Sequence, residues 1–391
     1  MSRISLNITG DIFLGRRLEL PAIERPYSLF DKDILQIFKS ADLNIVNLES
    51  PLTNCSNANK IVKTGPHLKA KPEVIGALKA INVSVATLAN NHIYDFGQKG
   101  LSDTLEACRV NNIRTVGAGI SFSEASKIFY TNISNTRIAI VNIAENEWCN
   151  AGEDHGGANP LHIIANVKSI HEAKSNADII LLIIHGGHEF YSYPSPRMVE
   201  LYRFYAEQGA SIVICHHSHC ISGYEIYNGV PIFYGLGNFL FDAEINFEQW
   251  FEGIFLSVDI DAENKISWTV HPYRQCGTNL MVELLHGKEK SEVENKITAI
   301  NTIIGDPQKL REQFSYFIKS QKKPVLSMFS TSNFINNRYF RSAIRKAGME
   351  RFFLRKAQLR SILNYVRCEA HRDITLDVLY NYLTENEKNN S

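Results

Sequence analysis

Residues 211–219 of this 391-residue chain read SIVICHHSH, a small and apolar run that ends in three imidazoles. The apolar half predicts a buried β-strand, and His216, His217 and His219 follow at its carboxyl end. In an α/β sheet the carboxyl ends of the strands form the ligand-binding edge, so a His-x-His pair there places ring nitrogens in a crevice. A structural role as hydrogen-bonded neighbours is the alternative, and the other motifs must decide between the two.

The composition indicates a large folded protein. With 44% hydrophobic residues the chain can bury a sizeable core, and its length predicts one large domain with an appendage, or two domains. The 41 basic and 41 acidic residues cancel, so the net charge gives no indication of binding to nucleic acid or to an anionic membrane surface. We therefore expect no nucleic-acid partner, and the sequence leaves the oligomeric state open.

The cysteines and the N-terminus indicate a compartment. The seven cysteines are scattered and form no Cys-x-x-Cys pair, which favours reduced thiols over a disulfide framework. Residues 1–8 alternate like a strand and lack the apolar segment of a signal peptide. No apolar run approaches the roughly eighteen residues of a membrane span. We expect a cytoplasmic protein without a transmembrane segment.

Three apolar segments in the first quarter of the chain end in polar residues. Residues 4–8 alternate as a strand and are followed by Thr9-Gly10-Asp11, which predicts a tight glycine turn that delivers a carboxylate. Residues 41–49 and 83–92 repeat the design, and buried amides or imidazoles after a strand need hydrogen-bond partners. The polar residues that follow these strands are Asp11, Glu49, Asn90, Asn91 and His92.

The second half of the chain carries similar segments. The most apolar run, residues 179–184, predicts a central strand and ends in His185-Gly186-Gly187-His188-Glu189, where the glycines allow close backbone approach to a ligand. The glycine-rich loop 235–239 contains Asn238, which we expect to face the same site. The loop 145–160 is rich in Gly, Asn and acidic residues and is a candidate lid.

Helix and turn signals separate these strands. Pro72 opens a predicted helix over residues 72–81, and Ser195-Pro196 predicts the start of a helix that Gly209 ends. Asn228-Gly229 predicts a two-residue hairpin turn.

The last quarter of the chain is predicted to be helical. Helical periodicity begins at about Glu283, which divides the chain into a domain of residues 1–280 and a helical extension of residues 285–391. Its basic face is either a solvated helix surface or a docking site for an anionic surface or polymer. The basic residues are Arg341, Arg345, Lys346, Arg351, Arg355, Lys356 and Arg360.

The polar groups at the strand ends have the composition of a metal site. They comprise two acids, one amide and four imidazoles: Asp11, Glu49, Asn91, His92, His185, His217 and His219. Mixed oxygen and nitrogen ligands favour Mn, Fe or Zn over Ca or Mg, which prefer oxygen ligands. We expect one or two divalent ions, because one acid can bridge a pair.

Together these motifs resemble the CapA-type capsule (poly-gamma-glutamate) synthesis family, which is similar to the calcineurin-like metallophosphoesterases. The resemblance covers residues 1 to about 275. The matching motifs are Gly10-Asp11, Asn47-Leu48-Glu49, Asn90-Asn91-His92 with Asp95 and Gly97, His185 with Gly187 and Glu189, His216-His217-Ser218-His219, and Gly235-Leu236-Gly237-Asn238-Phe239.

The resemblance implies an α/β fold of four layers, a metallophosphoesterase-like β-sandwich flanked by helices, with a C-terminal helical appendage. It also implies a division of roles. Glu49 bridges two ions; Asn91, His185 and His217 bind one of them; Asp11 and His219 bind the other; His92 is the catalytic proton donor; and Asn90, His188, Glu189, His216 and Asn238 contact the substrate. This chain departs from the wider pattern at Phe13, which replaces a histidine, and at Glu49, where the bridging acid is longer. It departs from the closer family at Gly186, which replaces an aromatic residue, and at Ser218, which replaces a proline.

The predicted function is a metal-dependent hydrolase of phosphoester type that acts on an anionic small-molecule or polymer substrate in capsule or surface-polymer synthesis. A bound ion lowers the pKa of water from 15.7 to about 7, and His92 protonates the leaving group. An amide hydrolase acting on a polyglutamate-like substrate is an open alternative. A non-catalytic accessory or scaffold protein of polymer assembly is another, since a fold alone does not confer activity.

Overall fold

The structure is a computed structural model that describes residues 3–277, 279–329, 346 and 356–389. The contacts divide the chain into two compact units. The first consists of Met1–Ile61 and Pro66–Arg311, and the second of Val62–Gly65 and Glu312–Ser391. The predicted site residues all lie in the first unit.

The first unit contains an eight-stranded sheet in the order β16-β15-β14-β1-β2-β3-β4, with β13 paired to β1. Strands β1 to β4 and β13 run parallel to one another. β14 is antiparallel to β1, and β14, β15 and β16 are antiparallel to one another in turn. The strands are β1 (Ile4–Phe13), β2 (Leu43–Leu48), β3 (Val85–Thr87), β4 (Arg114–Val116), β13 (Asn238–Phe241), β14 (Glu252–Ile260), β15 (Ile266–Gln275) and β16 (Val282–Leu284).

A second sheet of six strands has the order β11-β12-β10-β9-β7-β6. Its centre is parallel, because β7, β9, β10 and β12 run in one direction. The strands are β6 (Phe129–Ile133), β7 (Thr136–Ala144), β9 (Ile179–His185), β10 (Ile212–His216), β11 (Tyr224–Tyr227) and β12 (Val230–Phe233). A two-stranded sheet joins β5 (Ala118–Gly119) to β8 (Gly157–Ala158).

The two sheets pack face to face. One buried apolar cluster takes Leu6 and Ile45 from the first sheet and Leu181 and Ile214 from the second, and each of these side chains is at most 1% exposed. Every residue of β9 is buried, because the sheet is covered on both faces. The β-sandwich expected from the sequence is therefore present.

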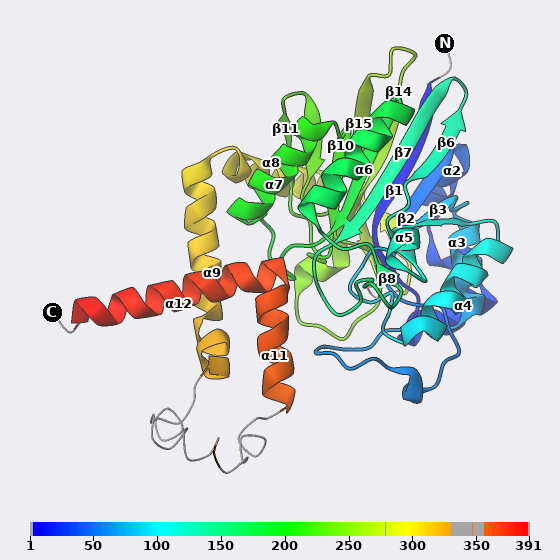
Figure 1. Cartoon of the computed structure of the whole chain (residues 1–391). Helices are drawn as coiled ribbons and strands as arrows, with labels where there is room; N and C mark the ends of the chain where they lie inside the picture. Colours follow the sequence, from blue (N-terminus) through cyan, green and yellow to red (C-terminus); the bar gives the residue numbers. More distant parts are fainter. Residues whose placement is uncertain (1–2, 278, 330–345, 347–355, 390–391) are drawn as a thin grey trace. The chain divides into compact units, whose positions relative to one another are not determined.

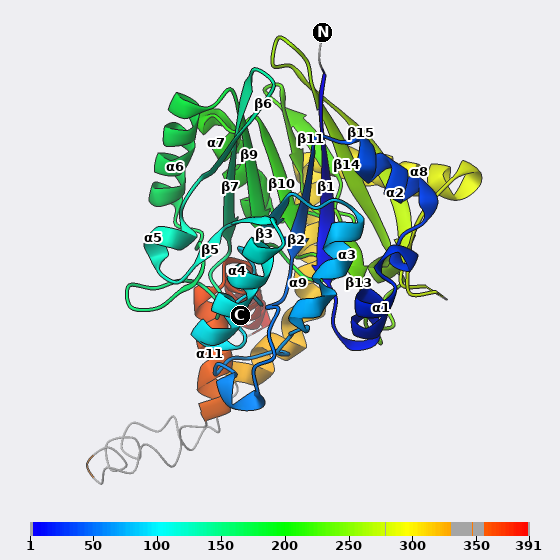
Figure 2. The same ribbon diagram turned by 90° about the vertical axis from the view of Figure 1, so that its right-hand side faces the viewer.

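Helices cover the outer faces of both sheets (Figures 1 and 2). A second apolar cluster packs α6 (Ile163–Asn176) and α7 (Pro196–Gln208) on the second sheet. A third cluster packs α2 (Lys32–Ser40), α3 (Ile75–Ala80) and α4 (Gly97–Val110) on the first. These four layers confirm the predicted fold class. The shorter helices are α1 (Glu19–Glu24), α5 (Phe122–Ala125), and the 3-10 turns η1 (Arg16–Leu18), η2 (Pro26–Leu29), η3 (Asn57–Asn59), η4 (Pro72–Val74) and η5 (Glu248–Phe251).

Several local signals act as predicted. The Ser195 side chain accepts from the Met198 N–H at the start of α7, and Gly209 follows its last residue with a φ of 126°. Asn228 and Gly229 have φ values of 49° and 83° in the turn between β11 and β12, which only a few residue types adopt readily. Pro72 opens η4, which continues into α3.

One local prediction is wrong. The expected glycine turn at Gly10 is absent, because β1 continues through Asp11 to Phe13. Gly10 is needed for another reason, since a Cβ there would lie 1.8 Å from the carbonyl oxygen of Gly237. That close approach lets β13 pair with β1 beside Asp11.

The C-terminal part is helical, as expected. α8 (Gly287–Ile304) belongs to the first unit, where Val293 and Ile297 are buried in the cluster between the sheets. α9 (Pro307–Phe329), α11 (Lys356–Arg367) and α12 (Glu369–Asn389) follow, and α11 contacts α12. The division into domains at residues 280–285 stays a prediction. Of the expected basic face, Arg341, Arg345, Arg351 and Arg355 lie outside the described residues.

Within the described residues, no helix is both long and apolar enough to cross a bilayer.

Candidate metal centre

The carboxyl ends of parallel strands from both sheets bring the predicted ligands together. In the first sheet β1 carries Asp11, Glu49 directly follows β2, and Asn91 follows β3. In the second sheet β9 ends at His185, and His217 follows β10, whose last residue pairs with His185. Two strand edges therefore supply one buried cluster from residues that lie up to 206 positions apart.

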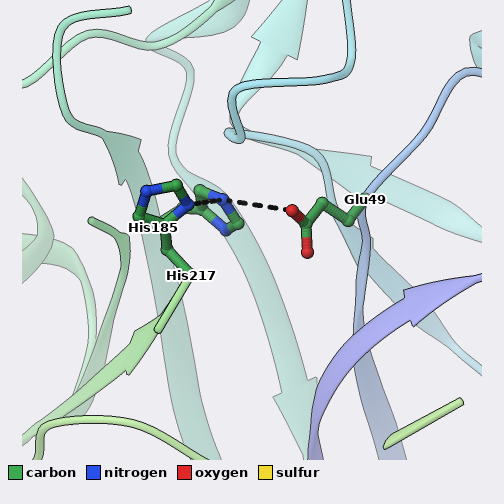
Figure 3. Close-up of side chains that lie close together, drawn as sticks. All are labelled: Glu49, His185 and His217. Atoms are coloured by element: carbon green, nitrogen blue, oxygen red, sulfur yellow. Dashed lines mark hydrogen bonds and ion pairs between the residues drawn. The ribbon is translucent and has the colours of Figure 1, made fainter. Parts of the chain in front are cut away.

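The first ligand group consists of Glu49, His185 and His217, whose donor atoms all lie within 4.8 Å of one another. His185 Nε2 is 3.1 Å from His217 Nδ1, 3.1 Å from Asn91 Oδ1 and 3.7 Å from Glu49 Oε1. Figure 3 shows the Glu49 carboxylate pointing at the two imidazoles. Two ring nitrogens, an amide oxygen and a carboxylate oxygen thus converge, which is the donor set that a transition-metal ion prefers.

The second ligand group consists of Asp11, Glu49 and His219, again within 4.8 Å of one another. His219 Nε2 is 3.6 Å from Glu49 Oε1, and its Nδ1 is 3.4 Å from Asp11 Oδ2 and 2.9 Å from Asn238 Oδ1. Glu49 therefore belongs to both groups, which is the position expected of a bridging carboxylate.

The environment of Glu49 shows whether the two ligand groups fit a metal ion. Its side chain is 0% exposed, and within the described part of the chain neither carboxylate oxygen has a hydrogen-bond partner. A buried carboxylate without a partner is strongly unfavourable. The residues fit a cation, because a positive charge between the two groups would satisfy both oxygens at once.

The pKa shifts of the cluster residues also fit a metal ion. Burial raises the pKa of Asp11, but a hydrogen bond with His219 and nearby histidine charges outweigh it and hold this pKa well below its usual value. Burial and the charge of Asp11 raise the pKa of Glu49 well above its usual value. Burial, reinforced by His217, lowers the pKa of His185. Burial opposes protonation of His219, yet Glu49 and Asp11 raise its pKa to about 10. Without an ion the cluster retains protons, so metal binding would displace them.

The backbone at the histidine pair is strained. His217 and His219 have φ values of 93° and 56°, a region that costs about 1–3 kcal/mol for a non-glycine residue. The His217 N–H donates to Asp11 Oδ2 over 3.2 Å, and the carbonyl of Ser218 accepts from the Phe190 N–H over 2.9 Å. The surrounding contacts therefore hold both imidazoles toward the cluster despite the strain.

His92 lies beside this cluster, next in sequence to Asn91, and is 6% exposed. Its Nδ1 is 2.8 Å from Asp95 Oδ2, and Asp95 also accepts from the Leu68 N–H. The carboxylate orients the ring. Asn90 is tied into the loop, because its amide donates to the Leu48 carbonyl and its oxygen accepts from the His92 N–H. The substrate contact of Asn90 and the role of His92 as proton donor both stay predictions.

The other predicted substrate contacts occupy varied places. His216 is buried, and its Nδ1 lies 3.6 Å from Asp11 Oδ1. His188 is buried, whereas Glu189 is exposed. Asn238 supports a ligand, since its oxygen lies against His219 and its amide donates to two backbone carbonyls. Their contacts with a substrate stay predictions.

The departures at Phe13 and Gly186 have structural explanations. The Phe13 ring packs 5.0 Å from Phe241 in an aromatic cluster, so it fills the position with apolar surface and supplies no ligand. A Cβ at Gly186 would lie 2.5 Å from Cγ of Glu145. Glu145 is itself buried and accepts from the Gly187 N–H and from Arg197. An aromatic side chain at residue 186 would not fit.

The sequence alone assigns no role to four polar residues around the cluster, although two of them, Asn47 and Asp95, belong to the motifs that carry the resemblance. Asn47 donates to Asp11 Oδ1 over 2.7 Å, and Asp95 Oδ2 lies 2.8 Å from His92 Nδ1. Glu145 and Glu147 follow β7, in the loop that was treated as a candidate lid; Glu147 Oε1 is 3.6 Å from His217 Nε2. The sequence does contain a signal for Glu145 and Glu147, because an acidic residue after an apolar strand is the same pattern that identifies Glu49.

Comparison with known proteins identifies the family. Residues 5–243 match the model of the bacterial capsule synthesis protein family PGA_cap, and this span includes both ligand groups. The chain belongs to this family. The resemblance inferred from the sequence motifs is thereby confirmed.

Two proteins named for PGA or capsule biosynthesis are similar to this chain. The chain is 34% identical over 245 residues to the PGA biosynthesis protein CapA of Bacillus subtilis. This match covers 61% of this chain and 63% of that protein. The chain is 30% identical over 251 residues to the capsule biosynthesis protein CapA of Bacillus anthracis, covering 61% and 60%. The match thus spans less than two thirds of these relatives.

A more distant relative and one solved structure complete the comparison. A probable polyglutamine synthesis accessory protein of Mycobacterium tuberculosis is 28% identical over 219 residues, covering 52% of this chain and 57% of that protein. A putative 5'-nucleotidase structure from Staphylococcus aureus aligns with a TM-score of 0.45 at 12% identity, covering 76% of this chain and 58% of that one.

Proposed function

We propose that this PGA_cap family member is a metal-dependent hydrolase with a two-ion centre, and that its reaction is phosphoester hydrolysis on an anionic substrate linked to capsule or polyglutamate synthesis. The observation that carries the proposal is Glu49, a fully buried carboxylate without a hydrogen-bond partner that faces two groups of ligand atoms. A scaffold protein has no physical reason to retain so unfavourable a group, because a neutral residue would stabilise it.

The chain's own residues would hold the ions in two sets. Asn91, His185 and His217 would hold one ion, Asp11 and His219 would hold the other, and Glu49 would contribute to both sets. Bound Mn, Fe or Zn ions would supply Lewis-acid polarisation of the substrate and a more acidic water at neutral pH. Asn47 fixes Asp11 through a 2.7 Å hydrogen bond, so the second set keeps its geometry.

His92 would act as the proton donor to the leaving group. It is next to a proposed ligand, Asn91, and its Nδ1 contacts Asp95, which leaves Nε2 as the atom that exchanges the proton. Asp95 would stabilise the protonated ring, because a buried carboxylate lies 2.8 Å away.

Two alternatives are tested by the same experiment. A Mycobacterium tuberculosis relative is named a probable accessory protein of polyglutamine synthesis, which favours a non-catalytic role as the alternative for this chain. Amide chemistry on a polyglutamate-like substrate is the second alternative, since the family is described as one of capsule synthesis. The cellular site that we propose is the cytoplasm, supported by seven cysteines that are all buried free thiols.

The test combines elemental analysis of the purified chain with a screen of phosphomonoester, phosphodiester and peptide substrates, the last including γ-linked glutamate oligomers. We expect bound Mn, Fe or Zn and turnover of a phosphoester that the His92→Ala protein largely loses while it keeps its metal. Turnover of peptide substrates alone would replace phosphoester chemistry by amide chemistry. A protein that holds both ions and turns over none of these substrates would favour the accessory role.

A further inference from the structure

Glu147 lies beside the first ligand group without belonging to it. It is in the loop that directly follows β7, and its Oε1 is 3.6 Å from His217 Nε2. The two side chains are 13% and 6% exposed, so the pair is largely withdrawn from water. A carboxylate and an imidazole at this depth attract each other more strongly than a surface pair does.

The two nitrogens of the His217 ring face different partners. Nδ1 is directed into the first ligand group, 3.1 Å from His185 Nε2, whereas Nε2 is directed at Glu147. An imidazole nitrogen that binds an ion must be deprotonated, so the proton of a neutral ring with Nδ1 as ligand resides on Nε2. The negative charge of Glu147, 3.6 Å from Nε2, then favours the proton on that nitrogen.

The loop that carries Glu147 is anchored on both sides. Before it, the Glu145 N–H donates to the His185 carbonyl over 2.9 Å, and the Asn146 side chain donates to the Leu161 carbonyl over 2.9 Å. After it, Cys149 is fully buried, and the Asn150 amide donates back to the Glu145 carbonyl over 3.2 Å. The acid is therefore held against His217 by the loop's own contacts.

Two other histidines of the centre also have one ring nitrogen facing a protein oxygen, at shorter distances. His92 Nδ1 is 2.8 Å from Asp95, and His219 Nδ1 is 2.9 Å from Asn238. In each, one nitrogen meets an oxygen acceptor of the protein and the ring is fixed in one orientation.

From this geometry we propose that Glu147 is a positioning residue of the metal centre: it fixes the proton of His217 on Nε2 and thereby presents Nδ1 to the ion of the first ligand group. The inference rests on the proposed metal centre and is independent of which bond the protein hydrolyses. Removing such an outer carboxylate typically lowers metal affinity by about 10–100-fold.

The test measures stepwise metal affinity of the full chain by titration against a competing chelator. Glu147→Ala removes the side chain and its charge, and Glu147→Gln removes the charge but keeps a polar side chain of nearly the same shape. Glu153→Ala and Glu153→Gln are matched controls, since Glu153 is exposed in the same loop. We expect one of two ions to bind about 10–100-fold more weakly in Glu147→Ala, with Glu147→Gln in between and the controls unchanged.

Two further readouts separate positioning from a general structural role. The thermal midpoint of the metal-free Glu147 variants should equal that of the wild type, and the visible absorption of the Co²⁺-loaded protein should change in Glu147→Ala but not in Glu153→Ala. Wild-type affinity for both ions in Glu147→Ala would overturn the inference. Loss of one ion as complete as in His217→Ala would also overturn it, because Glu147 would then be a ligand itself. If the wild-type protein binds no ion, both the proposed function and this inference are refuted.

Discussion

Replacing Glu49 by glutamine should have opposite effects on the metal-free and the metal-loaded protein. Both ligand groups share the Glu49 carboxylate, which is 0% exposed and has no hydrogen-bond partner within the described residues. Without metal this carboxylate destabilises the fold, and with metal it is a ligand. Glutamine has nearly the same shape without the charge, so it removes the cost of a buried charge and replaces a charged ligand by a weaker, neutral one.

The size of the first effect follows from burial. An unsatisfied buried polar group costs about 1–3 kcal/mol, and more when it is charged. We therefore expect the free energy of unfolding of metal-free Glu49→Gln to exceed that of the wild type by about 1–3 kcal/mol near neutral pH. At about 2–4 °C per kcal/mol, the thermal midpoint should rise by roughly 2–12 °C.

The pH dependence has a defined sign. Burial, with the charge of Asp11, raises the pKa of Glu49 well above 4.5, so the folded protein binds this proton more tightly than the unfolded chain does. The stability that protonated Glu49 contributes is fully present below about pH 4.5 and is lost as the pH rises toward the folded-state pKa. The advantage of Glu49→Gln should therefore grow between about pH 5 and pH 8.

The assay is thermal unfolding of both proteins across this pH range, once after chelation and once with added metal. Wild-type protein should gain about 2.7 kcal/mol when the free metal is at 100 times its dissociation constant, and Glu49→Gln should gain little. Glu153→Gln controls for the loss of one acidic charge at an exposed position of the same unit. The reasoning is refuted if metal-free Glu49→Gln is less stable than the wild type throughout the range, or if it still binds both ions.

Three further predictions concern the centre and its surroundings. Mild chelation should remove the ion of Asp11 and His219 before the other, because the first ligand group has more donors; elemental analysis showing parallel loss of both ions would contradict this. His217→Ala should lose metal, because His217 is a proposed ligand. His92→Ala should keep its metal and lose about 10²–10⁴-fold in turnover on a substrate with a poor leaving group. A metal-free His92→Ala protein would count against these separate roles of ligand and proton donor. A chain truncated after Arg311 should retain its metal, as measured by elemental analysis, and should hydrolyse large substrates less well. A truncated protein that is folded but holds no metal would show that the second unit supports the metal centre.

The sequence predicted the core of the centre because its signals are local. An apolar run with a period of two predicts a strand, and a polar residue directly after it has no favourable place in a core, so it marks the strand's functional end. That argument identified Asp11, Glu49, Asn91, His185 and His217, and the structure brings all five together. The hairpin at Asn228-Gly229 and the start of α7 were predictable for the same reason, since each depends on a few adjacent residues.

Other features depend on contacts between distant parts of the chain. No local pattern shows that α8 packs between strands of the first unit, because helical periodicity identifies an apolar face without naming its partner. Likewise, the sequence around Gly10 predicts a turn, whereas Gly10 is needed because the Gly237 carbonyl leaves no room for a side chain. The space at Gly186 is taken by Glu145, which comes from another strand end.

By itself, the sequence determined which side chains end the strands, and with them the family, the two sheets and the candidate ligand set. Only the tertiary structure decided how these side chains meet: that Glu49 belongs to both ligand groups, that Phe13 packs into an aromatic cluster, and that Glu147 faces His217. The physical reason is that a strand's pattern fixes which face a residue occupies, whereas the direction of a ring nitrogen or a carboxylate depends on packing between two sheets whose strands lie far apart along the chain.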